Sequence, residues 1–258
     1  MENAIEAGNT ARDRKPPDYA EAQRSYQSAA KLAPTDARPY EGLGNIYLEQ
    51  GLDQKAVEAY RKAVELKTTN ATVHEGLGDA YYRLGQYVES LAASGEAIRL
   101  NPGVPGPYFT RTHVNLTLGN GQAAGDDAHG FLNLWRPQWA GNPPYYIAMA
   151  GYLGYRHAGL TAKADKLLAG ASKECAEANW TCQLIKYLNR EVTAEQLLSQ
   201  ATDNDKLTEA HAYIGINLAL AGRSEESLPH LLWVKENGNR RFTEYALAVA
   251  WLGWLNQG

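Results

Sequence analysis

The sequence predicts an all-α fold built from stacked helix–turn–helix hairpins. Residues 37–104 form two successive 34-residue units in which the same kinds of residue fall at the same places. Within each unit the apolar and small residues are three or four apart, which is the spacing of one face of a helix. The alternation of apolar and polar residues that marks a strand is not sustained anywhere in the chain.

Each unit holds two helix faces joined by a glycine. A small residue at unit positions 8 and 20 lets the two helices approach closely, and large residues at positions 4, 11 and 24 fill the space beside them. Gly51 and Gly85, both at position 15, suit the left-handed conformation that ends a helix. The residues that define these faces are Tyr40, Leu43, Gly44, Tyr47, Ala56, Tyr60, Ala63 and Leu66 in the first unit, and His74, Leu77, Gly78, Tyr81, Ser90, Ser94, Ala97 and Leu100 in the second.

This pattern resembles the tetratricopeptide repeat (TPR), whose signature lies at these positions. The resemblance implies a right-handed α-solenoid, in which each hairpin contacts only its neighbours. It also implies a non-catalytic scaffold that binds other proteins. The alternative is that the array is the structural or regulatory part of a larger enzyme, signalling protein or membrane-anchored protein.

The repeat pattern extends in both directions from this centre. Upstream, a second helix with Ala22, Tyr26, Ala29 and Leu32 follows a first helix at about 4–14. Downstream, 105–138 keeps the phase, but Arg111, Thr112 and Asn115 replace the usual Leu, Gly and Tyr. Its glycines weaken a helix, so we expect this repeat to be degenerate and the softest. The TPR array is therefore expected to cover 1–138 with about four hairpins.

Residues 139–258 are expected to form a TPR-like helical module of their own. Three prolines in 135–144 predict an elbow before it. Hairpins are predicted over 145–178 and 208–241, shorter helices over 180–189 and 193–201, and a last helix from about Thr243. This part resembles a helical module that follows TPR arrays in bacterial proteins, which implies a bacterial origin and a helical end to the array. The resemblance rests on Trp180, Tyr187, Leu188, Leu197, Leu198, Ala201, Glu209, Ala210, His211, Tyr213, Ile214, Gly215, Gly222, Trp233, Val234, Gly238, Phe242, Thr243, Glu244 and Tyr245; Thr181 stands where the module commonly has proline.

Charge and composition exclude several classes of partner. The net charge of −4 argues against nucleic acid or an anionic membrane. No run of the sequence reaches the roughly eighteen apolar residues that span a bilayer. The polar stretch 1–15 lacks a signal-peptide core, which predicts a cytoplasmic chain as written, or an exported or periplasmic one if an upstream signal was removed. For Cys175 and Cys182 we expect free thiols; the alternative is a local disulfide in an exported form.

The sequence offers little for catalysis, and neither a cofactor nor a metal is expected. His74 and His211 lie at position 4 of their hairpins, where packing explains them. Asp126, Asp127 and His129 form a compact acid–histidine group, but without a second histidine at helical spacing a surface helix face is the better interpretation than a metal site.

The candidate functional surface is the groove formed by the first helices of successive hairpins. Positions 2, 5, 9, 12 and 13 share a face that is separate from the packing face. Its acidic and aromatic character predicts a partner segment that carries basic and apolar residues. The carboxylate clamp that some TPR domains use for chaperone tails is missing, because only Asn45 matches it. The predicted groove residues are Arg38, Glu41, Asn45, Glu49, Glu75, Asp79, Tyr82, Arg83, Phe109 and His113.

The end of the chain is unusually apolar for the last helix of a solenoid. Residues 246–255 form an uninterrupted apolar run that includes Trp251 and Trp254. Either this helix folds deeply into the superhelix, or it offers a surface for self-association or a partner.

Overall fold

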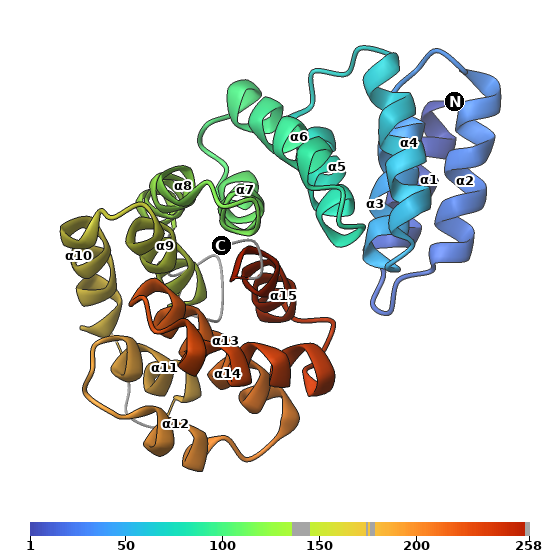
Figure 1. Ribbon diagram of the computed structural model, residues 1–258. Coiled ribbons are helices and arrows are strands. Elements are labelled where there is room, and N and C mark those ends of the chain that lie inside the picture. Colours follow the sequence, from blue (N-terminus) through green and yellow to red (C-terminus); the bar gives the residue numbers. More distant parts are fainter. Residues whose placement is uncertain (136–144, 174, 176–178, 256–258) are drawn as a thin grey trace. The chain divides into compact units, whose positions relative to one another are not determined.

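The computed structural model describes all residues except 136–144, 174, 176–178 and 256–258 (Figure 1). The described residues are mainly helical and include no strand, which confirms the all-α prediction. They form two compact units, residues 1–111 and 112–258. The predicted elbow at 135–144 falls almost entirely outside the described residues. The predicted end of the TPR array at 138 refers to the repeat signature in the sequence, and it stays a prediction. The boundary between the two compact units lies earlier in the chain, after residue 111.

The first unit contains three hairpins, α1–α2, α3–α4 and α5–α6. Each helix packs against the next, and the first helices also contact one another, α1 with α3 and α3 with α5. This is the stacking of a helical solenoid, with contacts confined to neighbouring hairpins. The helices are α1 (Glu2–Asp13), α2 (Tyr19–Leu32), α3 (Arg38–Glu49), α4 (Asp53–Glu65), α5 (Ala71–Arg83) and α6 (Tyr87–Leu100).

The turns inside the hairpins end the first helices as the repeat pattern predicts. Gly51 and Gly85 have φ of 69° and 73°, in the left-handed region that favours glycine. A Cβ at either glycine would meet nothing within 4 Å, so the backbone conformation and not crowding requires glycine there. Between hairpins, the Asn70 side chain caps α5 by accepting from the backbone N–H of Thr72 at 3.1 Å.

A tyrosine at position 24 joins each of the first two hairpins to the next. The buried ring of Tyr26 lies on Gly8 of its own hairpin and on Gly42 of the following one, and a Cβ at Gly8 would come within 2.6 Å of the ring. The ring of Tyr60 lies on Gly44 and Gly76 in the same way. We call these two rings and their glycines the tyrosine ladder. Close approach of the backbones is possible only because the facing residues lack side chains.

The third hairpin is built differently. Ser94 replaces the position-24 tyrosine, and its buried hydroxyl has no hydrogen-bond partner among the described residues. Ser90, at position 20, donates to the carbonyl oxygen of Gly78 at 2.7 Å. The same bond recurs in the second unit, where Ser227 donates to the carbonyl oxygen of Gly215 at 2.8 Å. This repeated bond supports the assignment of 208–241 to a TPR-like hairpin.

Helix α7 (Gly106–Thr117) crosses from the first unit into the second. The hairpins predicted over 145–178 and 208–241 are α9–α10 and α13–α14, with two short helices between them. The helices after α7 are α8 (Gly121–Leu134), α9 (Tyr145–His157), α10 (Thr161–Ser172), α11 (Trp180–Leu188), α12 (Ala194–Gln200), α13 (Asn204–Leu220), α14 (Ser224–Asn237) and α15 (Thr243–Leu255).

The last helix folds into the second unit. It packs against α13 and α14, and Leu247, Ala248, Trp251 and Leu252 are buried. The Trp254 ring stacks on His157 of α9 with the ring centroids 5.3 Å apart. Because Trp251 is only 5% exposed, the deep-packing interpretation is favoured, and we do not propose self-association through this helix. No described helix combines the length and the apolarity that crossing a bilayer requires.

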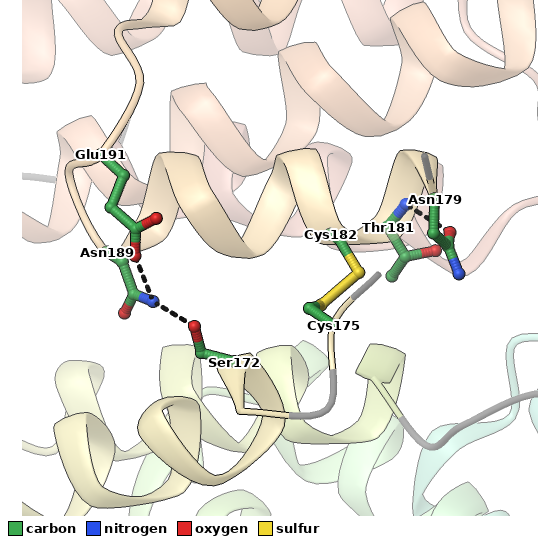
Figure 2. Close-up of a disulfide and its surroundings, with 7 residues drawn as sticks. All are labelled: Ser172, Cys175, Asn179, Thr181, Cys182, Asn189 and Glu191. Carbon is green, nitrogen blue, oxygen red and sulfur yellow. Dashed lines mark hydrogen bonds between the residues drawn. A yellow bond between two sulfur atoms is a disulfide. The ribbon is translucent and has the colours of Figure 1, made fainter. Parts of the chain in front are cut away.

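The two cysteines form a disulfide, so the expectation of free thiols was wrong (Figure 2). Cys182 is fully buried in the first turn of α11, and the bond ties this turn to Cys175, shortly after the end of α10. The Asn179 side chain caps α11 by accepting from the backbone N–H of Thr181 at 3.0 Å. At the far end of α11 the Asn189 amide donates to the Ser172 hydroxyl at 3.2 Å, so both ends of the helix are linked to the α10 region.

Candidate functional site

Eight of the ten predicted binding residues lie on the first helices α3 and α5, and the other two, Phe109 and His113, lie on α7. Successive first helices contact each other, so positions 2, 5, 9, 12 and 13 follow one another from hairpin to hairpin. We call this the first-helix face. Several of its polar residues are already engaged within the chain, and this could not be read from the repeat pattern.

Arg38 is committed to two carboxylates. Its guanidinium donates to Asp36 at 2.6 Å and to Glu2 at 2.7 Å. These bonds hold the pKa of both acids below their ordinary values. The arrangement joins the starts of α1 and α3, and it neutralises the Arg38 charge within the first unit.

Glu41 and Asn45 also have structural partners. The Glu41 carboxylate accepts from the Thr68 hydroxyl at 2.5 Å and from the Asn70 amide at 3.0 Å. It therefore holds the loop between α4 and α5. The Asn45 side-chain oxygen accepts from the Tyr60 hydroxyl at 2.7 Å, the bond that Asn9 forms with Tyr26 one hairpin earlier. Both residues keep the tyrosine ladder and its connecting loop in place.

Asp79 occupies the repeat position of Asn9 and Asn45 but has no ladder tyrosine to accept from. Instead it pairs with Arg83 at 2.8 Å, one turn further along α5. The same guanidinium lies 3.8 Å from Asp53. The centroid of the neighbouring Tyr82 ring lies 6.1 Å from that of Tyr87 on α6. The positive charge of Arg83 is thus neutralised by carboxylates of the first unit.

Glu75 differs from the other acids of this face. Its side chain is half-buried beside the start of α7, where a Cβ on Gly106 would collide with the carboxylate. Burial raises the pKa of Glu75, and the nearby Asp79 charge raises it further. The described residues provide no hydrogen bond or ion pair for this carboxylate. A partly desolvated acid without a counter-charge is a favourable place for a cation.

Glu49 lies nearer the first hairpin and is exposed. The pKa of Tyr19 is raised first by burial and then by the Glu49 charge, which places this carboxylate beside Tyr19. The Glu49 charge also helps to raise the pKa of Arg12 on α1, so part of its charge is offset there. Glu75 is the acid of this face for which the described residues provide no counter-charge.

The prediction of Phe109 and His113 as surface residues of the groove is correct only for Phe109. Phe109 on α7 is 38% exposed, which is unusual for so large an apolar side chain. His113 is only 3% exposed, so its side chain is not at a surface. Its prediction as a groove residue is corrected: the helical spacing identified the right helix, but it could not show that the later turns of α7 are buried.

The acid–histidine group on α8 has ordinary packing partners. Asp127 is buried and accepts from the Asn115 amide at 2.9 Å, so the surface-face interpretation was wrong for this residue. Asp126 is exposed and accepts from the Tyr155 hydroxyl at 2.8 Å. Within the described ranges, no three His, Cys, Asp or Glu side chains are grouped as metal ligands would be.

His74 is buried in α5, as predicted for position 4. His211 is only partly buried; its Nδ1 lies 2.9 Å from Nδ1 of His230, and its ring stacks on Trp233. Burial and the neighbouring His230 lower the pKa of His211 to about 4.

The second unit contains a buried polar cluster that sequence reasoning missed. The Glu209 carboxylate on α13 accepts from the Tyr146 hydroxyl at 2.9 Å and from the Trp180 ring nitrogen. Glu244 on α15 accepts from Tyr213 at 3.3 Å. Burial, with the charge of Glu244, raises the pKa of Glu209 to about 7. The spacing of these residues gave no signal, since they come from four separate helices.

Comparison with protein families finds one match, to the model described as TPR repeat, over residues 44–85. This is the centre of the region in which the 34-residue period is strongest.

Several solved structures have a similar fold. A tetratricopeptide repeat protein from Parabacteroides merdae matches with a TM-score of 0.60 and 16% identity, over 97% of this chain and 98% of that one. YrrB, described as a TPR protein with an unusual peptide-binding site, has a TM-score of 0.60 and 17% identity over 73% of this chain and 91% of its own. The MamA protein has a TM-score of 0.58 and 22% identity over 74% and 96%. At these identities the likeness concerns the fold alone, and no curated protein matches the sequence.

Proposed function

We propose that the first-helix face of this chain, whose residues 44–85 match the tetratricopeptide-repeat model, binds a segment of a partner polypeptide that carries basic and apolar residues. The general role, protein–protein interaction, is the one that TPR folds support. The observation that carries the finer proposal is the half-buried Glu75 carboxylate, which has a raised pKa and no counter-charge among the described residues.

The charge of the face favours a basic ligand. Arg38 and Arg83 do not oppose it, because each is held by carboxylates of the first unit. Glu75 remains without a counter-charge among the described residues. Glu49 on α3 adds an exposed negative charge, which Arg12 offsets in part. A lysine or arginine of the partner segment placed beside Glu75 would replace the lost hydration of this acid with a charge-assisted hydrogen bond. Selectivity for basic segments should weaken as salt is added.

The apolar part of the surface lies with Tyr82 and Phe109. Aromatic side chains bury a large area at a low cost in conformational entropy, and they are enriched among residues that dominate binding energy. A partner segment with an apolar residue near its basic one would use both features. The proposed ligand surface is therefore Glu49, Glu75, Tyr82 and Phe109, while Glu41, Asn45 and Asp79 support it.

The test uses an array of twelve-residue peptides in which lysine and leucine positions are varied, followed by titration of the best binder. Changing Glu49 and Glu75 together to lysine should weaken binding by about tenfold or more. Glu58→Lys combined with Glu89→Lys, on α4 and α6, is the matched control, since it makes the same charge change at exposed sites outside the face. Binding that survives the double reversal undiminished would place the ligand surface elsewhere.

A peptide that ends in the acidic tail of a heat-shock chaperone should not bind. The clamp positions that hold such tails carry Glu41, Gly42, Thr72 and Gly76, which supply no positive charge. Affinity for this tail equal to that for the basic peptides would contradict the proposed charge preference.

The disulfide supports an oxidising compartment as the place where the chain works. Disulfides persist in secreted, periplasmic and extracellular proteins and are rare in the cytosol. Protein taken from native cells and alkylated at once should show no free thiol at Cys175 or Cys182. Quantitative alkylation of both residues would instead indicate a reducing compartment.

A further inference from the structure

A second surface, separate from the first-helix face, lies between α8 and α10 in the second unit. Two cavities of about 420 Å³ and about 230 Å³ lie along it. They share Leu132, Leu167 and Gly170, so they are parts of one channel. Helices α8 and α10 both pack on α9 (Figure 1). Tyr155 and Ala148 of α9 line the cavities between them.

The walls of this channel follow from helical spacing in the sequence. Asp126, His129 and Asn133 are three and four residues apart on α8, and Lys163, Lys166 and Gly170 have the same spacing on α10. Each set therefore forms one stripe along its helix. The stripe on α8 runs from Asp126 to Asn133, seven residues or about 10 Å of helix. Trp135, which follows the end of α8, extends the lining of the channel beyond it.

One end of the channel carries a net positive charge. Asp126 is already engaged, because it accepts from the Tyr155 hydroxyl at 2.8 Å and from Lys163 at 3.4 Å. The Lys163 ammonium also lies over the Tyr155 ring, 5.2 Å from its centroid. Lys166 has no ion pair with any described residue, and it lines the channel opposite His129. The ammonium of Lys166 is thus the available charge.

The other end is apolar and open. Leu132 and Leu167 line it together with Trp135 and Ala171. Gly170 lies between the two ends, and a Cβ there would meet nothing within 4 Å. The space above this glycine is therefore not occupied by a described side chain, and the channel is continuous past it.

We propose that this channel binds a second polypeptide segment, one that places an acidic side chain at Lys166 and bulky apolar side chains toward Trp135. Charge complementarity selects the acidic residue, and the length of the channel matches about four residues of extended chain at about 3.4 Å each. The size and the mainly apolar lining are typical of binding sites. The first-helix face selects basic segments, so the two surfaces bind different sequences.

The experiment uses the full chain and a defined probe, the peptide Gly-Ser-Glu-Leu-Phe-Leu-Ser-Gly with both ends blocked. Titration into ¹⁵N-labelled protein should shift the amide signals of Gly170 and Leu132. The same peptide with lysine in place of glutamate should bind about tenfold more weakly, a difference of about 1.4 kcal/mol. Lys166→Glu should reverse this preference between the two peptides.

Two glycine variants test the channel itself. Gly170→Trp places an indole in the open space and should abolish the shifts at Leu132, whereas Gly170→Ala should bind as the unmodified chain does. Lys235→Glu, at an exposed position on α14, is the control for the loss of a positive charge. Lys166 is itself exposed, so Lys166→Glu gives a folded variant even where Gly170→Trp fails to fold.

Three outcomes would overturn the proposal. Equal binding of the glutamate and lysine peptides would remove charge complementarity. Gly170 and Leu132 signals that stay unchanged at millimolar probe would exclude binding of the peptide in the channel. Shifts of these signals by decanoate, a small amphiphilic carboxylate, and not by the peptide would assign the channel to a fatty-acid-like ligand instead.

Discussion

The two units of the chain reach a stable helical core by different means. In residues 1–111 one contact is repeated: a tyrosine ring on two glycines, with its hydroxyl bonded to an asparagine. Residues 112–258 keep one repeated contact, the bond from Ser227 to Gly215, but their helices are also held by contacts that occur once, such as the buried Glu209 cluster and the disulfide. Regular repeats can reuse one solution at each junction, whereas a module with weak repeat character needs a specific contact for each of its helices.

The largest expected effect comes from removing one ring of the ladder. Tyr60→Ala should lower the free energy of unfolding of the first unit by about 4 kcal/mol, because it leaves a cavity between two hairpins. Tyr60→Phe keeps the ring and loses only the bond to Asn45, so about 1 kcal/mol is expected. Chemical denaturation followed by hydrogen exchange of residues 1–111 measures both. Equal losses for the two variants would show that the hydroxyl and not the ring holds the junction.

The next effect concerns pH and the second unit. The pKa of Glu209 is about 7 in the folded chain and near 4.5 when it is exposed. Between these values the folded unit binds a proton that the unfolded chain releases. Stability therefore falls as pH rises from 4.5 to 7, by about 3 kcal/mol in all.

Glu209→Gln should remove that pH dependence. The lowered pKa values of His211 and His230 have the opposite effect on stability. Both histidines stabilise the fold while they are neutral, and this stabilisation is lost as pH falls below 6.5. The measurement is thus the difference in the free energy of unfolding between Glu209→Gln and the unmodified chain at each pH. Glu225→Gln, at an exposed position on α14, is the control. A difference that does not vary with pH would contradict the burial argument.

Opening the disulfide should have a smaller effect, again on the second unit. The bonded cysteines are seven residues apart, and closing so short a loop stabilises by about 2 kcal/mol. A Cys175→Ser variant should therefore lower the melting temperature of the second unit and leave that of the first unit unchanged. A reducing agent should have the same effect on the unmodified chain and none on the variant.

The last pair of expected effects, opposite in sign, concerns two glycines in the second unit, and the smaller of the two is the smallest effect expected. A Cβ at Gly125 would collide with the Tyr155 ring, whereas one at Gly170 would meet nothing within 4 Å. Gly125→Ala should cost about 1–3 kcal/mol through overpacking. Gly170→Ala should stabilise α10 by about 0.5–1 kcal/mol, because alanine is the better helix former. Thermal melts of the two variants should shift in opposite directions.

The repeat signature predicted the helices of the first unit well because its residues act through local spacing and close packing. Gly51 and Gly85 mark the turns, and Tyr26 and Tyr60 mark the junctions, so the periodic pattern carries the three-dimensional information directly. The hairpins of the second unit were found by the same means, although their signature is weaker.

The sequence was less informative about which polar residues remain available. Glu41 and Asn45 stand at groove positions, yet their partners, Asn70 and Tyr60, lie outside the groove pattern. The burial of His113 depends on packing that its position on α7 does not reveal. The cysteine pair shows the same limit: its spacing permits a bond, but it does not reveal that Cys182 is buried in the first turn of α11 beside Cys175.

The tyrosine ladder also restricts how such a chain can grow by gene duplication. Each ring spans two hairpins, so the glycine that receives it, Gly42 for Tyr26 and Gly76 for Tyr60, is encoded in the neighbouring repeat. A copy of the second repeat inserted directly after itself would bring both halves of the junction with it. The same copy inserted after the third repeat would follow Ser94, which stands where the other repeats have tyrosine. The copied Gly42 would then have no tyrosine ring to pack against it. The interchangeable part of the array therefore ends at the third hairpin.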